Sequence, residues 1–195
     1  MPSSDPAPSR RKLELLEAAY DYVLSNGLGE LSLRPLASAV GSSPRVLLYL
    51  FESKDGLIRA LLQRARVDEL TMLDTLHSGA AVPDLAGVGN LVWDWFVDPS
   101  HHDLLVLWAQ AYARSLAEPA GPWADFARQT VDDWLGVFAR YQPARFRRSA
   151  AGRSERTAVL SLLRGALLDL LATGDAARIT QAVRGELAAL NSRHS

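Results

Sequence analysis

The segment 31–57 constrains the fold most, because two short apolar helices are expected there on either side of a glycine turn. Ser32 stands at a cap position, and Pro35 falls in the first helical turn, where its missing N–H does no harm. Gly41 can adopt the left-handed conformation that ends a helix. Two short helices joined by such a turn form a helix-turn-helix.

The second helix of this motif is expected to start at Ser43 and Pro44 and to present polar side chains on one exposed face. Arg45 and Tyr49 are four residues apart and therefore project together. A cation beside a phenol on an exposed helix suits phosphates and base edges. The spacing thus predicts a helix that reads DNA, and Ser53 is expected to cap a long helix over 54–76.

These residues resemble the DNA-binding domain of TetR-family transcriptional repressors. The similarity covers residues 10–58, and its motifs occur in order: Arg11-Lys12-Leu13, Asn26-Gly27, Ser32-Leu33-Arg34, Gly41-Ser42-Ser43, Tyr49-Leu50-Phe51 and Ser53-Lys54-Asp55-Gly56-Leu57. The chain departs from the family pattern at Leu48, where the family commonly has tyrosine, and at Leu50, which replaces a usual His or Tyr. The resemblance implies DNA contacts from Ser32, Arg34, Ser42, Ser43, Pro44, Arg45, Tyr49 and Lys54.

Composition narrows the class of protein. Of 195 residues 48% are hydrophobic, which is enough for a sizeable core, but no apolar run is long enough to cross a membrane. The N-terminus lacks the apolar core of a signal peptide, so a cytoplasmic protein is expected. The absence of cysteine excludes disulfides, iron–sulfur clusters and thiol catalysis.

The charge of the N-terminal region gives little support to DNA binding. Residues 1–54 hold six Arg or Lys and six Asp or Glu, so their net charge is zero. The cations are placed on the N-terminal arm and around the two short helices, whereas most acidic residues are on the first helix or in loops. Modest affinity per subunit and dependence on dimerisation are therefore expected.

The whole chain is expected to be helical, with about nine helices and no β-sheet. Three regions are predicted: a disordered arm over 1–9, a helix-turn-helix domain over 10–55, and a helical ligand-binding and dimerisation domain over 56–195. In the last region helices are expected at about 83–97, 100–118, 154–172 and 175–191, with another ending near Tyr141. The segment 143–153 is expected to be a loop, and its arginines either contact an acidic partner or are merely solvated.

Aromatic residues are concentrated in the middle of the region 56–195, where all five tryptophans occur. They can be core residues, or they can line a cavity for an apolar ligand. The resemblance implies an effector pocket here, and a largely apolar, aromatic or lipid-like effector is expected. The candidate pocket residues are Trp93, Phe96, Trp108, Trp123, Phe126 and Trp134, with Gln110, Tyr112 and Asp169 as polar anchors.

The segment 159–171 carries an apolar band wider than one core face requires. It can be a central buried helix, or it can pair with the last helix to form a face that meets its copy across a twofold axis. The resemblance implies the second role for the last two helices. The interface residues expected on this basis are Leu160, Leu163, Arg164, Leu167, Leu171 and Ala182.

No catalytic or metal-binding pattern is convincing. His101 and His102 are adjacent, so on a helix they point about 100° apart and cannot easily bind one ion. Neither a cofactor nor an enzymatic activity is expected. The expected function is that of a homodimeric repressor that binds a palindromic operator in double-stranded DNA and is released by a small molecule. The alternative is a ligand-binding or enzymatic protein of the same fold that does not bind operator DNA.

Overall fold

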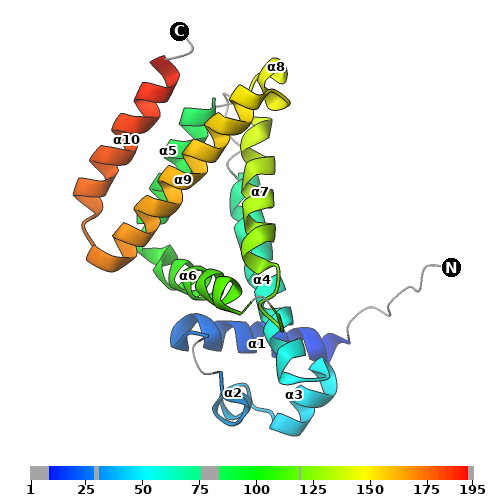
Figure 1. Ribbon diagram of the computed structural model, residues 1–195. Coiled ribbons are helices and arrows are strands. Elements are labelled where there is room, and N and C mark those ends of the chain that lie inside the picture. Colours follow the sequence, from blue (N-terminus) through cyan, green and yellow to red (C-terminus); the bar gives the residue numbers. More distant parts are fainter. Residues whose placement is uncertain (1–8, 29–30, 76–83, 119, 193–195) are drawn as a thin grey trace, which may run out of the picture.

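The computed structural model describes residues 9–28, 31–75, 84–118 and 120–192, and these ranges contain helices and no strand (Figure 1). The all-α fold class is therefore confirmed. Of the expected arm only Ser9 lies within the described residues, and its hydroxyl accepts the Lys12 N–H. The helices are α1 (Arg10–Asn26), α2 (Leu33–Ala39), α3 (Pro44–Phe51), α4 (Lys54–Thr75), α5 (Leu85–Val97), a 3-10 turn (Pro99–His101), α6 (His102–Ala117), α7 (Phe126–Arg140), α8 (Ala144–Arg147), α9 (Ala150–Thr173) and α10 (Ala176–Ser192).

The helix-turn-helix forms from local signals that the sequence carries. Gly41 has a φ of 61° and follows Val40, the C-cap residue of α2, so the glycine turn is confirmed. The Ser43 hydroxyl accepts the Val46 N–H at 3.3 Å and caps α3. Ser32 occupies the cap position of α2, but its hydroxyl makes no capping hydrogen bond, so the expected side-chain cap at Ser32 was wrong.

Two hydrophobic cores share the long helix α4. The first lies among α1, α2, α3 and the N-terminal half of α4, and it includes Leu15, Leu36, Leu47 and Leu61. Residues from further along the chain complete it, notably Leu107 of α6 and the segment 123–126. The helix-turn-helix is therefore packed directly against the helical body.

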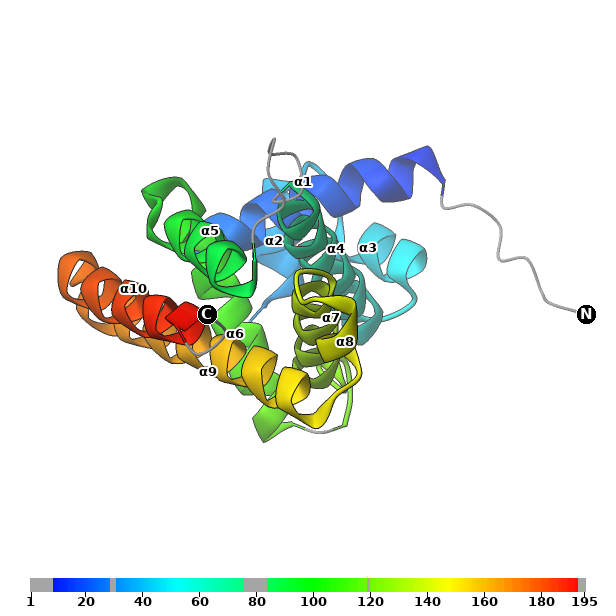
Figure 2. The ribbon, with the colours of Figure 1, turned by 90° about the horizontal axis from the view of Figure 1, so that it is seen from above.

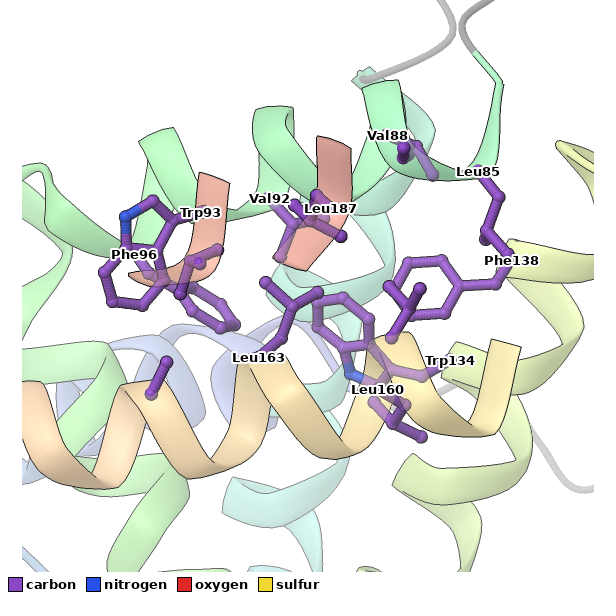
Figure 3. Packing of buried hydrophobic residues seen from close by; sticks show 14 of the residues in the cluster. Leu85, Val88, Val92, Trp93, Phe96, Trp134, Phe138, Leu160, Leu163 and Leu187 are labelled. Atoms are coloured by element: carbon purple, nitrogen blue, oxygen red, sulfur yellow. The ribbon is translucent and has the colours of Figure 1, made fainter. Parts of the chain in front are cut away.

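The second core lies among α5, α7, α9 and α10 (Figure 3). It contains Trp93, Phe138, Leu163 and Leu187, all of which are almost fully buried. Seen from above, α9 and α10 lie side by side at one edge of the molecule (Figure 2). Their exposed faces form a long two-helix surface that nothing else in the described chain covers.

The expected loop over 143–153 was wrong, because α8 and the first turn of α9 occupy this segment. The Ser149 hydroxyl accepts the Gly152 N–H at 2.9 Å and starts α9 before the expected position. Arg147 and Arg156 donate hydrogen bonds to the Gln142 and Arg147 carbonyl oxygens, respectively, which fixes the turn. Sequence periodicity cannot show such side-chain bonds to the backbone.

Candidate DNA-contacting surface and ligand cavity

Helix α3 buries one face and exposes the other. Leu47 and Phe51 are buried, whereas Tyr49 is 83% exposed and lies beside the exposed Arg45. In the described part of the chain, the side chains of Arg45 and Tyr49 make no hydrogen bond and no ion pair. No contact among the described residues therefore explains why a large aromatic and a cation share this face.

Cations surround a shallow depression beside α3. Its lining includes Ser32, Arg34, Pro44 and Lys54, which brings four of the eight predicted DNA-contacting residues together. Arg114 of α6 also lines it, with its guanidinium 2.7 Å from the Glu118 carboxylate. Sequence reasoning missed Arg114, because it is far along the chain from the motif.

The remaining predicted DNA-contacting residues have other positions. Ser43 uses its hydroxyl to cap α3, and Ser42 is half-buried in the turn, where its N–H donates to the Ala37 carbonyl at 2.8 Å. Arg45 and Tyr49 lie on the exposed face of α3. The exposed face and the cationic depression together form one polar surface around the helix-turn-helix.

A polar cluster fixes α1 to α4. The Tyr20 hydroxyl donates to the Asp68 carboxylate at 2.9 Å, and Arg64 donates to both Asp68 and Glu17. Burial and the hydrogen bond to Asp68 raise the pKa of Tyr20, so its hydroxyl stays protonated and donates. Because α1 packs on α2 and α3, this cluster ties the orientation of the helix-turn-helix to α4.

A separate cavity lies inside the helical body. Four of the predicted aromatic residues line it, namely Phe96, Trp108, Phe126 and Trp134. Its free volume is about 40 Å³, far below the ~300–1,000 Å³ typical of ligand pockets. A drug-sized molecule could enter only if the surrounding helices moved apart. The other lining residues are Ala65, Glu69, Met72, Trp95, Leu104, Leu105, Leu160, Leu163, Arg164 and Leu167.

The other predicted pocket residues lie outside this lining, and their role in ligand binding stays a prediction. Trp93 is in the core with its Nε1 donating to Thr180, and Trp123 belongs to the core of the helix-turn-helix. Gln110 accepts the Leu28 N–H at 3.0 Å, which bridges α6 to the end of α1. Asp169 is at the surface, where Arg178 neutralises it at 2.9 Å. Tyr112 is adjacent to the cavity through Arg164.

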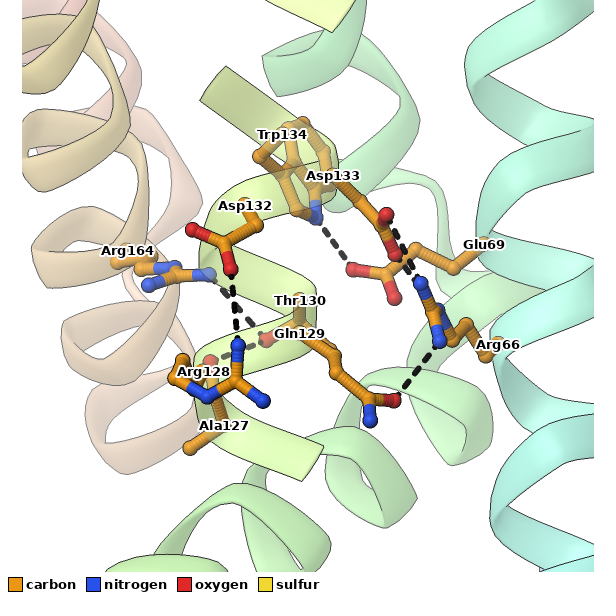
Figure 4. A network of polar contacts seen from close by, with 10 residues as sticks. All are labelled: Arg66, Glu69, Ala127, Arg128, Gln129, Thr130, Asp132, Asp133, Trp134 and Arg164. Atoms are coloured by element: carbon orange, nitrogen blue, oxygen red, sulfur yellow. Dashed lines mark hydrogen bonds and ion pairs between the residues drawn. The ribbon is translucent and has the colours of Figure 1, made fainter. Parts of the chain in front are cut away.

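Two charged residues at the cavity were missed from the sequence (Figure 4). Glu69 of α4 is only 9% exposed, and the Trp134 indole Nε1 donates a short hydrogen bond to its carboxylate. Burial raises the pKa of Glu69 to about 7. Nearby, Arg66 donates to the Asp133 carboxylate at 2.6 and 2.9 Å, so this arginine is fully paired.

Arg164 of α9 is the second missed residue. Its guanidinium donates to the Tyr112 hydroxyl at 3.2 Å and weakly to Thr130 at 3.4 Å. The centroids of the Tyr112 and Trp108 rings are 5.0 and 5.6 Å from its guanidinium carbon, and burial lowers its pKa. Sequence reasoning had placed Arg164 at the dimer interface, whereas its guanidinium lies inside the body.

We expect the buried Glu69 to make stability depend on pH. Its carboxyl stays protonated in the folded chain up to a pKa of about 7 but ionises near 4.5 when exposed, so the folded state holds one more proton in between. The protonated carboxyl therefore contributes to the free energy of unfolding in full below pH 4.5. This contribution, about 3 kcal/mol in total, is lost as the pH rises to 7. Urea titrations on both sides of this interval measure the loss.

Glu69→Gln tests this expectation, because glutamine keeps an acceptor for the Trp134 indole and cannot ionise. The variant should lack this pH-dependent component, whereas the exposed Glu52→Gln should behave as wild type. An unchanged pH dependence in Glu69→Gln would show that Glu69 is not the group responsible.

The predicted dimer residues divide between two faces of the last helices. Leu160, Leu163 and Leu167 are buried in the core or the cavity wall of a single chain, and their place in a dimer interface stays a prediction. Leu171 is half-exposed, and Ala182 is exposed. The exposed residues of α9 and α10 include polar ones, such as Gln181, Arg184 and Glu186, and small or apolar ones, namely Ala158, Ser161, Gly165, Leu168, Ala172, Ala182 and Gly185.

The fold has known counterparts. No protein-family model matches the chain, and a sequence comparison with curated proteins finds no match. Among solved structures, a transcriptional regulator from Rhodococcus sp. Rha1 has a TM-score of 0.73 at 16% identity, covering 92% of this chain and 95% of its own. A TetR transcription regulator from Haloarcula marismortui has a TM-score of 0.67 at 17% identity, with the same coverage. The multidrug binding protein EbrR, complexed with proflavin, has a TM-score of 0.69 at 18% identity, covering 93% and 99%.

The chain has the TetR fold. The likeness extends over both the helix-turn-helix and the helical body, because more than nine-tenths of each chain is covered. In the described residues of this TetR-fold chain, no helix is long and apolar enough to span a bilayer, and no three His, Asp or Glu side chains gather as a metal site would require.

Proposed function

We propose that this TetR-fold protein is a homodimeric transcriptional repressor that binds a palindromic operator and leaves it when a largely apolar molecule binds. The observation that carries the proposal is the exposed face of α3. Tyr49 and Arg45 project from a helix whose other face is buried, beside a depression bordered by Arg34 and Lys54. This arrangement suits base edges in a major groove and phosphates on either side of it.

A dimer formed through α9 and α10 would contain two copies of the DNA-contacting surface, one from each subunit. The exposed residues of these helices include small ones around Leu168, which is 55% exposed. Small residues permit close helix packing, and two helices from each chain form a four-helix interface. Two α3 helices related by a twofold axis would then meet half-sites about 34–36 Å apart.

Two helices connect the cavity to the DNA-contacting surface. Ala65 and Glu69 of α4 line the cavity, while Leu57 and Leu61 of the same helix pack under α3. Helix α6 contributes Trp108 to the cavity and holds the end of α1 through Gln110. Because the cavity is nearly closed, a ligand that opens it would shift α4 or α6 and change the separation of the two α3 helices.

The proposed mechanism divides the chain into two functional domains. Residues 10–55 would bind DNA, and residues 56–195 would bind the effector and the second subunit. The multidrug binding protein EbrR, which has this fold, was solved in complex with proflavin, and this supports a small-molecule effector for this chain. We propose no enzymatic role.

The test is selection of DNA from a random duplex library by the purified full-length protein. The proposal expects enrichment of a palindrome, with binding that weakens steeply as salt rises. Failure to enrich any sequence would favour the alternative, a ligand-binding protein of this fold without an operator.

We expect Arg45→Ala to weaken binding to the selected duplex by about 1–3 kcal/mol, because one base or phosphate contact per subunit is lost. Arg128→Ala removes the same charge from an exposed site on α7 and should leave affinity unchanged. Titration by fluorescence anisotropy at fixed salt measures both variants. Equal affinities of Arg45→Ala and wild type would remove Arg45 from the DNA contacts.

A further inference from the structure

Two hydrogen-bond donors gather at one end of the cavity, the Arg164 guanidinium and the Trp108 Nε1. Arg164 lies beside Trp108 and Tyr112, and no carboxylate of the described residues lies within ion-pairing distance of its guanidinium. The Trp108 Nε1 is buried and donates to no acceptor. Trp108 and Arg164 both line the cavity.

Both features are unfavourable in an apolar surrounding. A buried donor without an acceptor loses the hydrogen bond that it made to water, and a desolvated cation is stabilised when an anion lies beside it. Arg64, Arg66, Arg178 and Arg184 each have a carboxylate partner, whereas Arg164 donates to the Tyr112 and Thr130 hydroxyls. The buried Trp108 indole N–H, which has no acceptor among the described residues, therefore requires an explanation.

We infer that the effector is a monoanionic amphiphile, whose carboxylate or equivalent oxyanion is bound by Arg164 and Trp108 while its apolar body lies among the leucine and aromatic side chains of the cavity. This inference rests on the proposed function and specifies the class of effector. A carboxylate can accept hydrogen bonds from both a guanidinium and an indole N–H.

Glu69 is the other charge at the cavity, and its surroundings favour an anion over a cation as ligand. The groups that face it are Trp134 and the Arg66–Asp133 pair on one side and Arg164 on the other. Because burial disfavours the ionised form of Glu69, a cation would meet a neutral carboxyl here below a pH of about 7. An incoming anion would instead favour protonated Glu69, because like charges disfavour ionisation.

Proton uptake by Glu69 would couple anion binding to pH. Because burial raises the pKa of this carboxyl to about 7, the protein must gain a proton to bind an anion above that pH. Affinity for an anion should therefore fall as pH rises through 7 in wild type. Glu69→Gln should bind the anion with little dependence on pH over the same interval.

Three probes with one apolar chain and different head groups test the inference: octanoate, 1-octanol and octylammonium. Calorimetry on the full-length protein without DNA should show octanoate binding at least about tenfold more tightly than 1-octanol, since hydrogen bonds to charged groups contribute roughly 1.5–3 kcal/mol. Octylammonium should bind more weakly than either.

Substitutions of Arg164 test whether this residue causes the preference for octanoate over 1-octanol. Arg164→Gln should reduce the octanoate preference to near unity, Arg164→Lys should retain part of it, and Arg128→Gln on the exposed face of α7 should retain all of it. Circular dichroism checks that each variant is folded. If Arg164→Gln does not fold, the ratio of octanoate to 1-octanol affinity in wild type decides the question by itself.

Equal affinity for octanoate and 1-octanol, tightest binding of octylammonium, or no binding of any probe would each overturn the inference. Release of the selected duplex is measured separately. Octanoate that binds through Arg164 without releasing DNA would support this site and contradict the proposed repressor mechanism. Selection of a palindrome, together with equal affinity for the three probes, would support the proposed DNA-binding function and contradict the anion site at Arg164.

Discussion

Leu168→Glu is expected to convert the proposed dimer into a folded monomer. Leu168 is 55% exposed in a single chain and lies next to Gly165 and Ala172 on the outer face of α9. In a twofold interface each substitution occurs twice, so two carboxylates would be buried without partners. An uncompensated buried charge costs about 3–5 kcal/mol, and sedimentation velocity would show the monomer.

The loss of the dimer should also weaken DNA binding strongly, because two half-sites would no longer be bound by one linked pair of subunits. Leu116→Glu is the matched control, since Leu116 is 67% exposed on α6, away from α9 and α10. It should remain dimeric. Leu163→Glu would not serve, because Leu163 is 1% exposed in the core and the variant would unfold. A Leu168→Glu protein that stays dimeric with wild-type affinity would refute this interface.

The sequence predicted the helix-turn-helix well because its signals are local. The cap at Ser43, the left-handed Gly41 and the N–H of Gly56 donating to Ser53 each depend on residues within a few positions of one another. Helix boundaries there match the sequence expectations closely. Local backbone chemistry is what a single sequence expresses most directly.

The interface residues could not be predicted in the same way. Helix α9 is apolar or small on both faces, so periodicity marks two stripes without showing which one faces the core. The structure buries Leu160, Leu163 and Leu167 against α5 and α7, and leaves the stripe through Leu168 outside. The choice depends on neighbours that are distant in the sequence.

The cavity was predicted in part. The excess of tryptophan identified Trp108 and Trp134, but Glu69 and Arg164 come from helices outside the aromatic segment. One signal was present: Arg164 is the single charge within the apolar run 159–168. A lone cation in such a run predicts either a surface position or a buried functional group, and only the packing of α6 against α9 distinguishes the two.

Gly56→Ala is expected to destabilise the helix-turn-helix, although alanine in a helix normally stabilises it by up to ~1 kcal/mol. A Cβ at this position would lie 2.0 Å from the Phe51 carbonyl oxygen, which is backbone at the end of α3. The turn cannot relax easily, because Glu52 already has a φ of 67° and Ser53 holds the Gly56 N–H at 2.9 Å. The clash must therefore move α3 relative to α4, at a cost of about 3 kcal/mol.

Displacement of α3 should reduce affinity for the selected duplex even under conditions where the rest of the chain stays folded. Gly136→Ala on the exposed face of α7 is the control, since a Cβ there meets nothing within 4 Å. It should raise stability by about 0.5–1 kcal/mol and leave DNA affinity unchanged. Urea unfolding and anisotropy titrations compare the two variants. If Gly56→Ala gained stability as Gly136→Ala does and bound DNA as wild type does, the close approach of α3 to α4 would not be what orients the DNA-contacting helix.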